Sequence, residues 1–182
     1  MQRRFQQIDV FSESLLGNPV GVVLDAEGLA GEQMQRFAQW TNLSETVFLL
    51  PPRDASADYR VRIFTPSQEL PFAGHPTLGA CHAWASTAGS DAERVVQECA
   101  AGLIPVRKSG RNWAFAAPNL VRSGPVDDRD LDRITRALGI DAGEVVAAQW
   151  VDNGPGWVAV LLPTVEALLA LRPGPLDGFF IG

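Results

Sequence analysis

The sequence predicts a mixed α/β (α+β) fold, because strand-like and helix-like patterns follow one another along its 182 residues. The clearest strand is 58–64, where Tyr59, Val61 and Ile63 alternate with residues that point to the opposite face. A helix is predicted directly after it at 76–88, with Pro76 in the first turn, where proline costs no intrahelical hydrogen bond. Its apolar face is expected to carry Leu78, Cys81, Ala85 and Ala88.

The remaining elements are assigned from the same two periodicities. Strands are predicted at 3–11, 20–24, 47–50, 94–100, 103–108, 113–116, 144–151 and 157–162, and helices at 30–41, 127–138 and 164–172. Gly139 is expected to end the helix at 127–138. Residues 178–182 have the composition of the start of a buried strand. Residues 118–125 suggest a linker, which divides the chain into domains 1–118 and 119–182.

Composition excludes several classes of function. The chain is 46% hydrophobic and 20% charged, as expected of a globular protein, and its formal charge of −6 argues against nucleic acid as a partner. No apolar run approaches the roughly 20 residues that span a bilayer, and the N-terminus lacks a signal-peptide core. The two cysteines form no disulfide framework, which favours a cytoplasmic location.

The loop at 73–75 is a candidate anion site. Gly74 allows a ligand to approach the backbone closely, and open N–H groups at a helix start favour negative charge. We therefore expect this loop to suit a small carboxylate. The alternative is an ordinary connection between a strand and a helix.

Glu45 is the carboxylate with the most suggestive position. It lies between an expected helix and an expected strand, flanked by Leu43 and Val47, where partial burial would suit a general base. Its polar neighbours Ser44 and Thr46 leave open that it is a solvated or helix-capping carboxylate.

Other reactive residue types give weaker signals. His75 could orient a substrate or move a proton, or it could hydrogen-bond to its own loop. His82 lies two helical turns further on, but no third ligand completes a metal site at that spacing. Cys99 fits a small core residue better than a nucleophile, and neither Ser44 nor Ser67 has the neighbours of a catalytic triad. We therefore expect neither a metal nor a cofactor.

Five stretches taken together resemble the phenazine-biosynthesis PhzF family of isomerases, which have the diaminopimelate epimerase fold. They are residues 7–11, 17–20 (Gly-Asn-Pro-Val), 42–46 (Asn-Leu-Ser-Glu-Thr), 65–79 and 151–157, in family order. The resemblance implies two α/β halves, each a curved mixed sheet around a central helix. The helix at 76–88 would be the central helix of the first half.

The resemblance also implies roles for individual residues. Glu45 would be the catalytic acid–base group, and Asn18, Gly74, His75 and Thr77 would bind the substrate. Related epimerases use a pair of cysteines, but Ala73 stands before Gly74 where a thiol would be needed. A carboxylate mechanism without cofactors is therefore implied.

One part of the family pattern is missing from this sequence. Family members are longer, and a run of the type Pro-Glu-Asp-Pro-x-Thr-Gly-Ser-Ala in their second half has no match in residues 147–182. We therefore expect a complete first half and a truncated second half. The expected function is an isomerase acting on a small carboxylic acid. The alternative is an inactive fragment that binds a small acid or a partner chain, and a homodimer is left open.

Overall fold

The computed structural model describes residues 2–11, 15–175 and 180–182, and these form two compact units, Met1–Pro118 and Asn119–Gly182. Each unit has its own hydrophobic cluster or clusters, built from its own residues. The units are therefore described separately.

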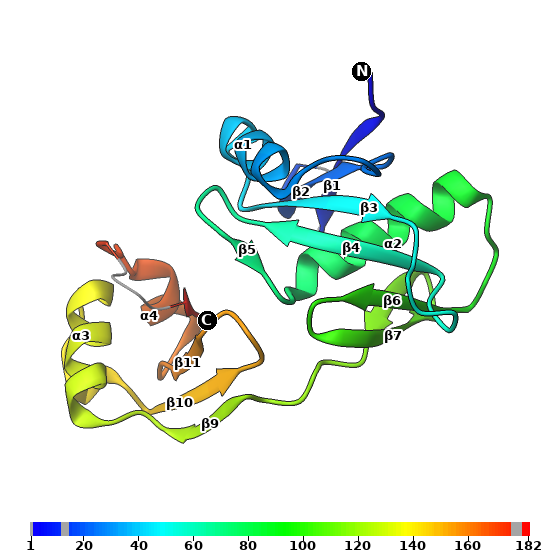
Figure 1. Cartoon of the computed structure of the whole chain (residues 1–182). Helices are drawn as coiled ribbons and strands as arrows, with labels where there is room; N and C mark the ends of the chain where they lie inside the picture. Colours follow the sequence, from blue (N-terminus) through cyan, green and yellow to red (C-terminus); the bar gives the residue numbers. More distant parts are fainter. Residues whose placement is uncertain (1, 12–14, 176–179) are drawn as a thin grey trace. The chain divides into compact units, whose positions relative to one another are not determined.

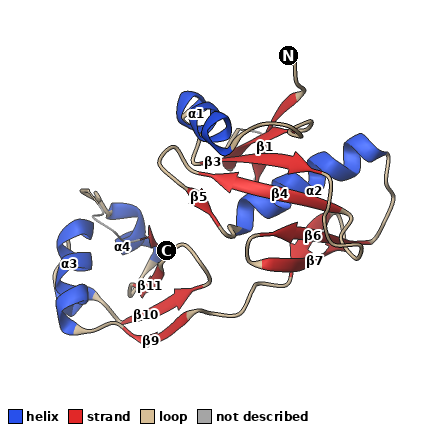
Figure 2. Cartoon of the chain, in the orientation of Figure 1, coloured by secondary structure: helices blue, strands red, loops and turns tan. Residues whose placement is uncertain are grey.

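The first unit is built on a mixed sheet with the strand order β1-β2-β3-β4-β6-β7-β8, and β5 pairs with β4 (Figure 2). Neighbouring strands are antiparallel except for β2 with β3 and β4 with β6, which are parallel. The strands are β1 Phe5–Val10, β2 Asn18–Val23, β3 Glu45–Leu50, β4 Tyr59–Phe64, β5 Glu69–Leu70, β6 Arg94–Cys99, β7 Gly102–Ser109 and β8 Asn112–Phe115. The short strand β5 was not predicted from the sequence.

Helix α2 (Gly74–Ala88) is the central helix of this unit, and it packs against β1 and β8, which are the two ends of the sheet, as well as strands between them. Figure 1 shows α2 beside β3 and β4. The sheet therefore curls around the helix. The curled sheet buries residues on several sides of α2, as the resemblance implied for a central helix: His75, Pro76, Thr77, Gly79, Ala80, Cys81, Ala83 and Ala85. The expected face residues Leu78 and Ala88 are less buried than these.

Helix α1 (Gly31–Thr41) covers the outer face of the same sheet. Met34 and Ala38 pack there against Phe48 of β3 and Phe64 of β4. Strand β3 is therefore buried on both faces, which explains why its residues 47–50 form a continuous apolar run rather than an alternating pattern.

The second unit has a smaller sheet with the strand order β12-β11-β10-β9. Its elements are β9 Arg122–Pro125, α3 Asp128–Leu138, a 3₁₀ turn at Ala142–Glu144, β10 Ala147–Asp152, β11 Trp157–Leu161, α4 Val165–Ala170 and β12 Phe180–Ile181. The core is formed by Ile134 and Leu138 of α3 with Trp150 and Val158 of the sheet. As predicted, Gly139 ends α3 in the left-handed conformation.

Three sequence predictions need correction. Residues 122–125 are a strand rather than linker, and β9 is an edge strand, where a proline such as Pro125 is tolerated. Glu45 is the first residue of β3 rather than part of a loop, because it pairs in register with Val20 of β2. Helix α4 is shorter than the predicted 164–172, and residues 178–179 of the predicted last strand lie outside the described residues.

Candidate active site

The site forms where two parallel strands and the central helix all begin. Because β2 and β3 run parallel with Val20 opposite Glu45, the first residues of both strands lie at the same edge of the sheet. Asn18 opens β2, Glu45 opens β3, and His75 lies in the first turn of α2, which packs against both strands. The structure therefore brings together three of the five residues that were predicted to form the site.

The centre of the site is a contact between a carboxylate and an imidazole. The Oε2 atom of Glu45 lies 3.5 Å from Nε2 of His75, and the two side chains are only 15% and 8% exposed. Neither of these two atoms has a hydrogen-bond partner within the described part of the chain. Buried polar atoms are rarely left without partners, so such a pair is a candidate for contact with a ligand.

The imidazole of His75 is held in its neutral form. Burial lowers the pKa of His75. The Glu45 carboxylate and the backbone carbonyl of Pro19 raise this pKa, but by less than burial lowers it. The position of His75 at the start of a helix also disfavours a positive charge. A neutral imidazole can donate one hydrogen bond and accept another.

Asn18 and Ser44 extend the pair towards the surface. The Nδ2 atom of Asn18 lies 3.5 Å from Nδ1 of His75, and the hydroxyl of Ser44 donates to Oδ1 of Asn18 at 3.0 Å. Phe11, with its ring centre 6.3 Å from that of His75, is exposed beside them. Neither Phe11 nor Ser44 was predicted to bind the substrate, although both lie in stretches that carry the family resemblance, 7–11 and 42–46.

The start of α2 has backbone donors without an acceptor among the described residues. The amides of Gly74 and His75 are in the first helical turn, where no intrahelical acceptor exists, and Ala73 provides no side-chain cap. Gly74 also has no room for a side chain, since an added Cβ would lie 2.9 Å from the ring of Phe115. These two amides fit the predicted carboxylate site.

Thr77 is placed differently from the other predicted residues. It is fully buried, and both its amide and its hydroxyl donate to the carbonyl of Ala73. The hydroxyl also accepts a hydrogen bond of 3.0 Å from Nε2 of Gln97, which is itself fully buried on β6. Thr77 therefore connects the first turn of α2 to β6 through Gln97. Its own amide and hydroxyl hydrogens are already used within the fold, so they are not available to a ligand.

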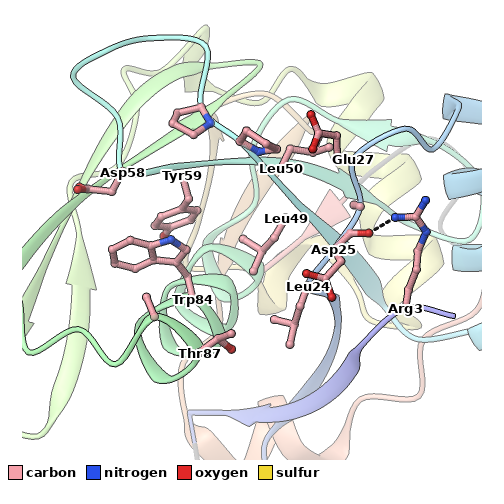
Figure 3. Close-up of a pocket in the computed structure, with 14 residues that line it drawn as sticks. Arg3, Leu24, Asp25, Glu27, Leu49, Leu50, Asp58, Tyr59, Trp84 and Thr87 are labelled. Atoms are coloured by element: carbon pink, nitrogen blue, oxygen red, sulfur yellow. Dashed lines mark hydrogen bonds between the residues drawn. The ribbon is translucent and has the colours of Figure 1, made fainter.

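A separate pocket of about 530 Å³ lies towards the other end of α2 (Figure 3). It is lined by Tyr59, which stacks on Trp84, and by Thr87, about 18 Å along the helix from His75 at roughly 1.5 Å per residue. Burial raises the pKa of Tyr59 well above its usual value, and Asp25 is already paired with Arg4. Neither Glu45 nor His75 lines this pocket.

The described residues offer little support for other chemistries. They contain no cluster of three or more side chains placed to hold a metal ion. Burial raises the pKa of Cys81 to about 12 and also raises that of Cys99, so both thiols stay protonated at neutral pH. No described helix combines the length and the apolar character needed to cross a membrane.

The first unit, a mixed sheet that curls around a central helix, has the architecture that the sequence motifs predicted for the first half. The chain belongs to the PhzC-PhzF family of phenazine biosynthesis-like proteins, which matches residues 8–177. The family assignment made from the sequence motifs is thus confirmed.

Three similar proteins show the range of this family. An uncharacterized isomerase from Mesorhizobium japonicum is 53% identical over 93% of this chain and 59% of its own length. The trans-2,3-dihydro-3-hydroxyanthranilate isomerase of Pseudomonas aeruginosa is 41% identical over 93% of this chain and 61% of its own length. A solved structure, described as a predicted epimerase from Pseudomonas aeruginosa, matches with a TM-score of 0.76 and 27% identity over 99% of this chain and 69% of that one. The chain spans about three-fifths of the length of the two curated relatives.

Proposed function

We propose that this protein is an isomerase that moves a proton between two carbon atoms of a small carboxylic acid, with Glu45 as the acid–base group. The observation that carries the proposal is the buried contact between Glu45 and His75 at the start of α2, whose facing atoms have no other partner among the described residues. A buried carboxylate with a free oxygen is suited to accept a proton from a bound substrate.

The steps follow from the chemistry of the two side chains. The Glu45 carboxylate takes a proton from a C–H bond and becomes a carboxylic acid, and the electron pair of that bond moves into the substrate. Glu45 then returns the proton to a different carbon and is a carboxylate again. The neutral imidazole of His75 orients the substrate, and no cofactor or metal takes part in the proposed steps.

The substrate class is proposed from the backbone donors beside this pair. The open amides of Gly74 and His75 can bind one carboxylate group, and the helix dipole favours a negative charge there by about 0.3–1 kcal/mol. The relative named for trans-2,3-dihydro-3-hydroxyanthranilate supports the same class, because that name denotes a cyclic carboxylic acid.

The proposal is tested by following proton transfer directly. The chain is incubated in deuterated water with trans-2,3-dihydro-3-hydroxyanthranilate, and deuterium in the recovered compound is measured by mass spectrometry. Proton transfer through a side chain exchanges with solvent, so the unmodified chain should incorporate deuterium. Glu45→Gln should lower the rate by on the order of 10²–10⁴-fold, the usual contribution of a general acid–base group.

Glu32→Gln is the matched control, because Glu32 is exposed on α1 and the substitution removes the same charge. It should leave the rate unchanged. Equal rates for Glu45→Gln and the unmodified chain would remove Glu45 from the mechanism. Binding of the acid without deuterium exchange in any variant would instead favour the alternative, a protein that binds small acids without catalysis.

A further inference from the structure

The two ring nitrogens of His75 face groups of different character. Nδ1 lies 3.5 Å from the amide nitrogen of Asn18, and Nε2 lies 3.5 Å from a carboxylate oxygen of Glu45. A neutral imidazole carries its hydrogen on only one nitrogen, and its two partners decide which one. The arrangement around His75 therefore selects a tautomer.

We propose that Asn18, held in place by Ser44, is a positioning residue that keeps His75 in the tautomer with its hydrogen on Nε2, directed at an ionised Glu45. This inference rests on the proposed function, since it states how the proton acceptor of that function is kept ready.

The contact with Glu45 gives the first argument. An ionised carboxylate can only accept hydrogen bonds, so Nε2 must carry the hydrogen if the contact is to be favourable. With the hydrogen on Nδ1, a lone pair of Nε2 would face a lone pair of Oε2 at a site where both side chains are largely withdrawn from solvent. Buried polar groups that face each other without a hydrogen are costly.

The contact with Asn18 gives the second argument. The Ser44 hydroxyl donates to Oδ1 of Asn18, which leaves the NH₂ end of the amide directed at Nδ1 of His75. An NH₂ group donates to the lone pair that Nδ1 carries in this tautomer. Ser44, Asn18 and His75 then form a series in which each donor meets an acceptor, and the Nε2 hydrogen of His75 faces Oε2 of Glu45 across the 3.5 Å contact.

The competing arrangement is also defined by the structure. The backbone carbonyl of Pro19 also interacts with the His75 ring, and a tautomer with its hydrogen on Nδ1 is the alternative. That tautomer would require Glu45 to be protonated and to donate to Nε2, which would remove the proton acceptor. Asn18 therefore favours the arrangement in which Glu45 can accept a proton over the one in which Glu45 is already protonated.

The experiment is a two-dimensional ¹H–¹⁵N correlation of the histidine rings at neutral pH, recorded on the full chain with ¹⁵N-labelled histidine. The chain contains two histidines, and His82→Gln identifies the signals of His75. We expect a pyridine-type resonance for Nδ1 and a pyrrole-type resonance for Nε2. A pyrrole-type Nδ1 with a pyridine-type Nε2 in the unmodified chain would overturn the proposal.

The variant Asn18→Asp tests the cause. A carboxylate at this position can only accept, so Nδ1 should gain a hydrogen and its resonance should move to the pyrrole-type region. Asn112→Asp adds the same charge at an exposed position of β8 and should leave both His75 resonances in place. Unchanged His75 resonances in Asn18→Asp would show that Asn18 does not set the tautomer.

This readout needs no catalysis, so the two proposals fail separately. A confirmed Nε2–H tautomer together with an unaffected Glu45→Gln exchange rate would leave the positioning role intact and remove the proposed function. The opposite tautomer together with a strongly reduced Glu45→Gln rate would remove the positioning role of Asn18 and leave the proposed function intact.

Discussion

The protonation of His75 depends on its burial. Its side chain is 8% exposed, and burial is the main cause of its lowered pKa. In the unfolded chain the same side chain should titrate near its ordinary pKa of about 6.5. The folded state therefore binds a proton at His75 less readily than the unfolded state does.

This difference predicts how stability depends on pH. The contribution of His75 is fully present above about pH 6.5 and is lost as the pH falls from there towards the lowered pKa, because the unfolded state then binds more protons. Urea unfolding of the chain at several pH values should show this loss. His75→Gln should have a flatter dependence than the unmodified chain over the same interval.

The exposed His82 provides the control for this prediction. His82→Gln should keep the pH dependence of the unmodified chain. Identical pH dependence in His75→Gln and the unmodified chain would mean that burial of His75 has no energetic consequence.

At the scale of the element, α2 is positioned by a buried polar contact beneath its first turn. Thr77 accepts from Gln97 and donates to the carbonyl of Ala73, and Thr77 and Gln97 are both completely buried. The helix start is thereby attached to β6, and with it the open amides that form part of the site.

Thr77→Val should therefore destabilise the first unit although it keeps the shape of the side chain. The amide group of Gln97 would lose its acceptor in a buried position, at a cost of about 1–3 kcal/mol. The midpoint of urea unfolding, followed by tryptophan fluorescence, measures this loss. Thr87→Val, at an exposed position of the same helix, should change stability by less than about 0.5 kcal/mol.

A double variant checks the cause. Replacing both partners, as in Thr77→Val with Gln97→Leu, removes the unsatisfied amide and should recover part of the lost stability. If the double variant loses as much stability as the two single variants lose in total, Thr77 and Gln97 do not act as a pair.

At the scale of the whole molecule, the chain is divided into two units with separate cores. Residues 116–121 connect β8 to β9 without regular secondary structure, and Leu120 is about half exposed. A unit of this size with its own core can fold independently. We predict that residues 1–118 do so.

Limited proteolysis should cut the chain near residues 117–120 and leave a resistant fragment of the first unit. A chain of residues 1–118 made alone should unfold in one cooperative transition, reported by Trp40, Trp84 and Trp113. Absence of a cooperative transition in this fragment would show that the first unit needs the second. In the full chain, Trp150 and Trp157 report the second unit.

Much of the local structure could be predicted from the sequence, since the information lies within a few residues. The alternation in Tyr59–Phe64 and the glycine after α3 correspond to the observed strand and helix end. Predictions failed where distant residues decide the environment. Residues 122–125 look like a linker until they pair with β10, and Glu45 looks like a loop residue until β3 pairs with β2.

The sequence by itself determined the mixed α/β class, the family and the candidate residues Glu45, Gly74 and His75, because these depend on patterns and motifs that are contiguous in the chain. Only the tertiary structure placed Asn18 beside His75, 57 positions away, and turned Thr77 into the core. Both outcomes depend on the register of β2 against β3 and on how α2 packs against these two strands. Register and packing are properties of pairs of distant segments, which no single stretch of sequence contains.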